Sequence, residues 1–253
     1  MTATPSGMTY ADYLELDTIL GAQKPHSALH DEMLFIVIHQ TEELWLKQML
    51  HELDYAIEMV REDNFTLLDK TLSRINRIVK TMTVAWEVLT TLTPVDYMKF
   101  RDVLGTSSGF QSAQFRQFEY RLGIRNRAYL KNYEEGSETR ARLEAVLAAP
   151  SLADEATAAL GRKGFDVSSE EAVAASWLTV YRNADANLAL YGLAEKLVDL
   201  DEALAVWRHR HVLMVERVIG MKQGTGGSAG APYLRETLTK RAFPVLWNLR
   251  TEI

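Results

Sequence analysis

Apolar residues recur along most of this chain at intervals of three and four, which is the period of a helix with one buried face. The first such stretch covers residues 31 to about 61, with apolar positions at Phe35, Ile38, Leu46, Met49, Leu53, Ile57 and Val60. A second stretch, residues 66–92, repeats the pattern through Leu68, Leu72, Ile75, Val79, Met82, Trp86 and Leu89. The pattern predicts two long helices.

Shorter helices are predicted for the rest of the chain. In TPVDYMKFRDVLG, Thr93 can cap a helix, Pro94 suits its first turn and Gly105 suits its exit. Further helices are predicted over residues 110–122, over residues 169–221 with a break near 183–187, and over residues 232–248.

Strand signals do not occur in the sequence, since no alternating apolar and polar runs are bounded by hairpin turns. Residues 126–169 contain several glycine and proline breaks, which predict short helices there. We therefore predict an all-α fold, a helical bundle, with residues 1–253 as a single domain.

The amino-acid composition excludes several classes of function. The 28 lysines and arginines are spread among 34 acidic residues, for a net charge of −6, so we expect no nucleic-acid partner. The absence of cysteine excludes disulfides, thiolate metal sites and a cysteine nucleophile. No apolar run reaches 18 residues and the N-terminus lacks a secretory pattern. We expect a cytoplasmic protein without membrane association.

The glycine-rich stretch GTGGSAG, residues 224–230, has two interpretations. It can be a flexible linker between two helices. Alternatively, it can close over a bound ligand, with Thr225 and Ser228 offering hydroxyls and backbone N–H groups. A nucleotide-binding P-loop is excluded, because no Gly-Lys-Ser/Thr follows and no strand precedes it.

The six histidines limit the metal chemistry available to the chain. None has a glutamate three residues earlier, as a di-iron bundle requires, and the zinc motif H-E-x-x-H is absent. The remaining option is haem iron held by one imidazole. His211, in VWRHRHVLMVERVIG, shares a helix face with Trp207, Val215 and Val218, while Arg208 and Arg210 can meet propionates or acidic neighbours. A histidine on such a face can equally be a core residue.

Two other groups are candidates for binding. His39 lies one turn after Phe35 and one turn before Glu42 and Glu43, so it can line a pocket or form a hydrogen bond to a carboxylate in the core. Tyr97 and Arg101 share a helix face and can converge on one carboxylate, because a guanidinium binds both carboxylate oxygens. A surface ion pair of Arg101 with Asp96 or Asp102 is the alternative.

Four blocks in this order resemble the tryptophan 2,3-dioxygenase family: TYADYLELD, DEMLFIVIHQTEELWLKQ, YMKFRDVLGTSSGFQS, and WRHRH followed by RVIGMKQGTGGSAG. The resemblance runs from about Tyr10 to the tail and is thin over residues 125–183. It implies an all-helical fold around one haem b per subunit, and a homotetramer built as a dimer of dimers.

The resemblance also implies roles for individual residues. His211 matches the axial haem ligand, and His39 matches the histidine that accepts the indole N–H, its tautomer held by a carboxylate or water. Arg101, assisted by Tyr97, matches the partner of the substrate carboxylate. Thr225, in a glycine-rich active-site loop of residues 222–231, matches a contact to the substrate ammonium and carboxylate.

Further matches concern the walls of the pocket and the N-terminus. Phe35, Phe100 and Leu104 match residues that surround the indole, and Ser108 matches a serine on the distal side of the haem. Tyr10 and Tyr13, within residues 1–20, match tyrosines that reach a neighbouring subunit. His209 departs from the family, where an apolar residue is more usual. Helical geometry separates it from His211 by about 200°, so only one of the two can face a cavity.

The implied reaction inserts O2 across the indole C2–C3 bond of L-tryptophan and gives N-formyl-L-kynurenine, the first step of the kynurenine pathway of tryptophan catabolism. Two alternatives stay open. One is a related haem enzyme that oxidises a modified tryptophan or hydroxylates tyrosine. The other is a haem-binding sensor without turnover, which consumption of oxygen dependent on an amino acid would distinguish.

Overall fold

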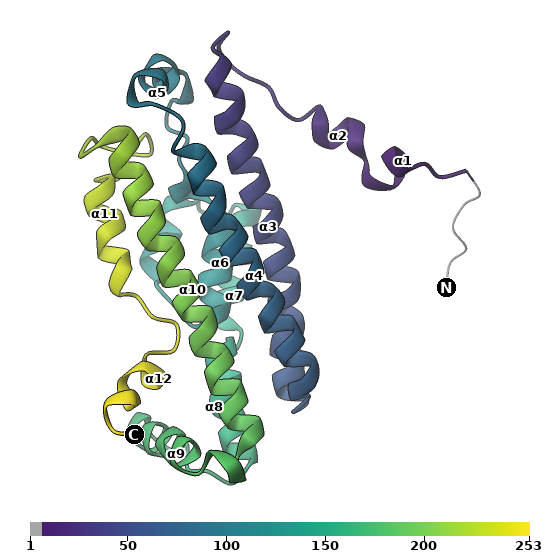
Figure 1. The fold of residues 1–253 in the computed structure, drawn as a ribbon, viewed down its shortest axis with the longest axis vertical. Coiled ribbons are helices and arrows are strands. Elements are labelled where there is room, and N and C mark those ends of the chain that lie inside the picture. The colour runs from purple at the N-terminus through teal and green to yellow at the C-terminus, as the bar shows by residue number, and fades with distance from the viewer. Residues whose placement is uncertain (1–6) are drawn as a thin grey trace.

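The structure, a computed structural model, describes residues 7–253. Three long helices form its frame: α3 (His30–Arg61), α4 (Phe65–Leu89) and α10 (Leu188–Ile219). They lie side by side along the long axis of the molecule, and α4 packs against both others (Figure 1). No strand occurs among the described residues. The predicted all-helical fold is confirmed.

The two predicted long helices match α3 and α4. Asn64 caps α4 by accepting a hydrogen bond from the Leu67 N–H, so the boundary falls where an asparagine side chain can satisfy a free backbone donor. Between α3, α4 and α10 lies a continuous apolar core, whose largest fully buried side chains include Met49, Leu53, Leu68, Leu72 and Ile75. This core fixes the three helices relative to one another.

Short helices close one side and one end of the frame. They are α5 (Pro94–Phe100), α6 (Ala113–Leu122), α7 (Glu138–Ala148), α8 (Leu152–Arg162) and α9 (Glu170–Arg182). Short 3-10 segments occur between the helices, at Arg101–Leu104, Gly109–Gln111, Arg127–Asn132 and Ala184–Ala186. The predicted break between α9 and α10 is confirmed. The helix predicted over residues 110–122 begins as α6 only after Ser112, which caps it.

The prediction of one helix over residues 232–248 is wrong. The chain forms α11 (Ala231–Glu236), a 3-10 turn at Thr237–Thr239, and a separate α12 (Pro244–Asn248). A proline disfavours helical backbone in the residue before it and has no N–H to donate. The buried carboxylate of Asp201 accepts hydrogen bonds from the Ala242 and Phe243 N–H groups and from the Trp247 indole, which fixes the extended segment against α10.

The N-terminal segment stands away from the bundle. Helices α1 (Tyr10–Leu14) and α2 (Leu16–Leu20) project sideways from the start of α3 (Figure 1). Neither helix has a buried residue. The side chain of Gln23 donates to that of Gln40, which ties the end of the segment to α3.

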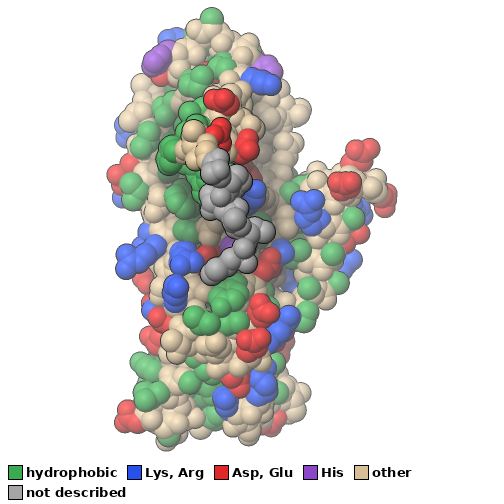
Figure 2. Space-filling model, turned by 90° about the vertical axis from the view of Figure 1, so that its right-hand side faces the viewer, with side chains coloured by type: hydrophobic (Ala, Val, Ile, Leu, Met, Phe, Trp, Pro, Cys, Tyr) green, Lys and Arg blue, Asp and Glu red, His purple; other side chains and the backbone are tan. Residues whose placement is uncertain are grey.

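Hydrophobic side chains are visible among charged ones on the face from which this segment projects (Figure 2). On α3, Met33, Val37, Leu44 and Tyr55 are exposed, and their spacing of 4, 7 and 11 residues puts them on one side of the helix. Among the described residues, no helix is both long enough and apolar enough to cross a membrane.

Candidate active site

A cavity lies between α3, α4, α6 and α10 and is closed on one side by the glycine-rich loop and α11. Its walls are mostly apolar and aromatic: they include Phe35, Leu46, Met82, Trp86, Leu89, Phe110, Phe115, Trp207, Met214 and Val218. Two imidazoles, from His39 on α3 and His211 on α10, also line it. A flat apolar ligand suits such walls.

His39 is held in one tautomer by its own helix. Its Nδ1 atom lies 2.7 Å from the carbonyl oxygen of Phe35, one turn earlier. A carbonyl oxygen can only accept, so Nδ1 carries the hydrogen and Nε2 keeps a free lone pair. Burial lowers the pKa of His39, which keeps the ring neutral at pH 7. The ring is therefore an acceptor at the wall of the cavity.

The expectation that a carboxylate or water holds this tautomer is wrong, because the Phe35 carbonyl does so. Glu43 instead accepts a hydrogen bond from the Gln114 side chain on α6. The Oε1 atom of Glu42 is buried without a hydrogen-bond partner and lines the cavity. Burial, assisted by the nearby charge of Glu43, raises the pKa of Glu42 to about 8.

His211 faces the cavity from the opposite helix. Its ring stacks on the indole of Trp86, with centroids 4.7 Å apart and planes at 6°, and Trp207 lies 5.3 Å away. Burial, with a smaller effect of His39, lowers the pKa of His211 to about 4, so this ring is neutral as well. His209 is exposed, which makes His211 the imidazole of this pair that reaches the cavity.

Tyr97 and Arg101 lie at the end of α5, which Thr93 caps as predicted by accepting a hydrogen bond from Asp96 N–H. Tyr97 lines the cavity, and Arg101 donates a hydrogen bond to the Gln223 carbonyl at the start of the glycine-rich loop. The alternative of a surface ion pair for Arg101 does not hold, because among the described residues it pairs with neither Asp96 nor Asp102, and Asp96 pairs with Lys99 instead. The Nε atom of Arg101 is buried and unpaired.

The glycine-rich loop folds over this end of the cavity instead of spanning it as a free linker. The hydroxyl of Thr225 donates to the Ser107 carbonyl, and Thr225 and Ser108 both line the cavity. A Cβ on Gly226 would lie 2.7 Å from the Cβ of Ser108, so the close approach of loop and wall requires glycine there.

The remaining predicted residues occupy other places. Phe100 is fully buried and packs edge-on against Phe35, 5.8 Å between ring centroids, so it supports the wall from behind. Leu104 packs against the core. Tyr10 and Tyr13 are 76% and 75% exposed on α1 and do not reach the cavity of their own chain.

Several polar groups around the cavity were not found from the sequence. Buried atoms without a hydrogen-bond partner include the indole Nε1 of Trp86 and of Trp207, the Nε of Arg116 and the Oε1 of Glu42, and all four residues line the cavity. Buried polar groups are normally paired, so such a concentration indicates that a ligand supplies the partners. The helical period marked the tryptophans only as core positions.

No group of three histidine, aspartate or glutamate side chains suited to a metal ion occurs in residues 7–253. Over the described residues, the fold and the site define an all-helical protein with an aromatic cavity, into which two neutral imidazoles project from opposite helices. This arrangement suits a flat ligand with few polar atoms.

Comparison with known proteins identifies the family. The family model of tryptophan 2,3-dioxygenase matches residues 1–170 and 144–253. The tryptophan 2,3-dioxygenase of Caulobacter vibrioides is 51% identical over 97% of this chain and 98% of its own. Those of Bacillus cereus and Burkholderia pseudomallei are 48% and 47% identical over 97% of this chain, and over 93% and 85% of their own. The chain belongs to the tryptophan 2,3-dioxygenase family.

Proposed function

We propose that this chain is a haem-dependent tryptophan 2,3-dioxygenase that inserts both atoms of O2 across the indole C2–C3 bond of L-tryptophan and releases N-formyl-L-kynurenine. Membership of the family supports this activity. The structural observation that carries it is the pair of neutral imidazoles, His39 and His211, on opposite walls of one apolar cavity.

Haem b fits the residues present. His211 is neutral, faces the cavity and has no hydrogen bond to another described residue, so it would hold the haem iron. The unpaired indole N–H groups of Trp86 and Trp207 and the aromatic walls suit a flat porphyrin with polar edges. When bound, the haem supplies the redox chemistry with dioxygen that no side chain of this protein provides.

His39 orients the indole. Its Nε2 lone pair can accept the indole N–H, while the Phe35 carbonyl holds the imidazole in that tautomer. An indole N–H is a very weak acid, and oxygen attack at C2–C3 needs no prior loss of this proton. We therefore assign His39 to positioning the ring. Phe35 contributes the apolar wall beside it, 4.2 Å from the His39 ring between centroids.

Arg101, Tyr97 and Thr225 bind the amino-acid end of the substrate. The Arg101 guanidinium is half-buried and has an unpaired Nε, so it can pair with a carboxylate. Thr225 is positioned by the closed loop and can contact the ammonium and carboxylate groups. Residues 222–231 act as an active-site loop that excludes water, with Ser108 as the wall against which it closes.

The active assembly is a homotetramer, and residues 1–20 of one subunit complete the site of a neighbour through Tyr10 and Tyr13. Three observations support this: the segment projects from the bundle, its tyrosines are exposed, and α3 carries an exposed apolar face beside it. Phe100 supports Phe35 from behind, and Leu104, which packs against the core, completes the apolar surroundings of the indole. Residues 1–253 form one domain.

The proposed function is tested by loading the purified protein with haem, reducing it, and supplying L-tryptophan in air. We expect N-formylkynurenine by mass spectrometry, no product from His211→Ala, and full activity from the exposed control His209→Ala. Haem binding without tryptophan turnover would instead favour a sensor or a different substrate.

A further inference from the structure

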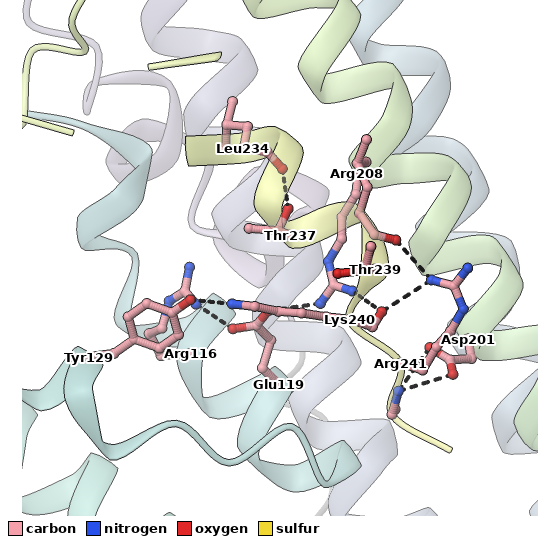
Figure 3. Close-up of polar contacts among 12 residues, drawn as sticks. Arg116, Glu119, Tyr129, Asp201, Arg208, Leu234, Thr237, Thr239, Lys240 and Arg241 are labelled. Carbon is pink, nitrogen blue, oxygen red and sulfur yellow. Dashed lines mark hydrogen bonds and ion pairs between the residues drawn. The ribbon is translucent and has the colours of Figure 1, made fainter. Parts of the chain in front are cut away.

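Three charged side chains are buried together at one wall of the cavity: Arg116 and Glu119 on α6, and Arg208 on α10 (Figure 3). One oxygen of Glu119 accepts a hydrogen bond from Arg116, and the other accepts from Nη2 of Arg208 at 2.8 Å. Arg208 also donates to the Lys240 carbonyl at 2.9 Å. We call these three residues the α6–α10 charge cluster.

The α6–α10 charge cluster carries an excess positive charge. It holds two guanidinium groups and one carboxylate, which gives a formal net charge of +1, and Arg116, Glu119 and Arg208 are only 7%, 2% and 3% exposed. Lys240 lies nearby, and its ammonium donates to the hydroxyl of Tyr129, so it supplies no negative charge to the cluster. A buried charge without a counterion is costly, so this arrangement is suited to receive an anion.

Arg116 is the residue of the α6–α10 charge cluster that is able to bind an anion. Its guanidinium stacks on the ring of Tyr129, with its central carbon 4.2 Å from the ring centroid, which fixes the plane of the group. Its Nη1 atom is used by Glu119, but its Nε atom is buried without a partner. All three residues of the cluster line the cavity.

We propose that Arg116 binds a carboxylate of the cofactor, a haem propionate, with Glu119 and Arg208 as the residues that position it. This inference rests on the proposed haem site. The substrate carboxylate has its own partner in Arg101, next to the glycine-rich loop, whereas the α6–α10 charge cluster lies on α6 and on α10 one turn before His211. The helix that supplies the iron ligand therefore also positions Arg116, through Arg208 and Glu119.

The test compares two porphyrins that differ only in charge at the propionates. The cofactor-free full-length protein is titrated with ferric protoporphyrin IX and with its dimethyl ester, and binding is followed by absorbance and tryptophan fluorescence. Variants are Arg116→Met, which keeps an unbranched apolar side chain but removes the charge, and Arg116→Lys, which keeps the charge. Arg241→Met is the matched control, since Arg241 donates to backbone carbonyls near the cluster but does not line the cavity.

We expect wild-type protein to bind the diacid at least about 30-fold more tightly than the diester, as loss of one partner of a desolvated charge pair implies. Arg116→Met should lose at least about 30-fold in affinity for the diacid and less than twofold for the diester. The affinity of Arg116→Lys for the diacid should lie between those of Arg116→Met and wild type. The affinity of Arg241→Met should equal that of wild type. The absorbance of the bound haem should keep its histidine-ligated form in every variant.

Equal affinity of wild-type protein for both porphyrins would overturn the inference even if Arg116→Met failed to fold. Equal losses for both porphyrins in Arg116→Met would also overturn it, since they would indicate a structural role. If Arg116→Met weakened the binding of L-tryptophan but not of the diacid, Arg116 would bind the carboxylate of the substrate. That result would reject the haem propionate as its partner. Failure of wild-type protein to bind either porphyrin would reject the proposed haem function itself.

Discussion

The imidazole of His211 lies parallel to the indole of Trp86, with 4.7 Å between ring centroids and 6° between planes. This contact fixes the plane of a neutral imidazole that has no protein hydrogen-bond partner in the described part of the chain. Across the cavity, the Phe35 carbonyl fixes the tautomer of His39. The two histidines are thus fixed by different means, one by stacking and one by a hydrogen bond within its helix.

Removing the Arg101 guanidinium should impair recognition of a free amino acid. Arg101→Met should lower kcat/KM for L-tryptophan by about 30-fold or more, because losing one partner of a desolvated charge pair costs about 2 to 5 kcal/mol. Steady-state kinetics with L-tryptophan and tryptamine, which lacks the carboxylate, measures this. An equal loss with tryptamine would contradict the assignment, and Lys99→Met, which removes an exposed surface pair, should behave as wild type.

Replacing His39 should weaken the reaction without abolishing it. His39→Ala loses one hydrogen bond to the indole N–H, which is worth about 1 kcal/mol, so a drop in kcat/KM of about 5- to 10-fold is expected. The variant should also discriminate less than wild type against 1-methyl-L-tryptophan, which has no N–H to donate. A loss of more than about 10⁴-fold would mean that His39 acts as a general base, against the positioning role.

Glu42 should make the protein less stable as pH rises. Its folded-state pKa of about 8 is above the ordinary value of 4.5, so the folded state binds the proton more tightly, and this contribution to stability is present below pH 4.5 and lost as pH rises towards 8. Glu42→Gln should therefore raise the free energy of unfolding near pH 8 by up to about 4 kcal/mol, and by little at pH 4.5.

Urea unfolding of the cofactor-free protein at the two pH values measures this effect. Glu58→Gln is the control, because Glu58 lies on the same helix, α3, is exposed, and forms no ion pair among the described residues. A gain from Glu42→Gln that is the same at both pH values would show that ionisation of Glu42 is not the cause.

Gly226 should be needed for the closed loop. Gly226→Ala places a Cβ 2.7 Å from the Cβ of Ser108, so the loop must move away from the wall, and KM for L-tryptophan should rise by about tenfold as Thr225 is displaced. Gly192→Ala is the control: its Cβ meets nothing within 4 Å in the exposed part of α10, and it should leave KM unchanged. An unchanged KM in Gly226→Ala would show that substrate binding does not depend on closure of the loop.

The helices were largely predictable because their signals are local. Asn64, Thr93 and the break at residues 183–187 mark boundaries by capping and turn chemistry that each segment carries in itself. The single helix predicted over residues 232–248 failed because its break depends on Asp201, a buried carboxylate on α10 that accepts hydrogen bonds from the N–H groups of residues 242 and 243 and holds them outside a helix. Such a contact between distant segments leaves no periodic signal.

The site was predictable to a similar degree. The spacing of His39 after Phe35 put both on one helix face, and the structure adds that the Phe35 carbonyl, not a carboxylate, fixes the tautomer. Arg116, Glu119 and Trp86 were missed, because they appear in the sequence only as members of amphipathic helices. Their importance comes from burial and from unpaired atoms, which depend on how α4, α6 and α10 pack together.

The measurement that tests the central claim most directly follows the oxygen atoms. Haem-loaded, reduced protein is given L-tryptophan under isotopically labelled O2, and the product is examined by mass spectrometry. The account predicts N-formylkynurenine in which both new oxygen atoms carry the label. A product with one labelled oxygen would indicate a hydroxylating enzyme, and haem binding with no change to tryptophan would contradict the dioxygenase function.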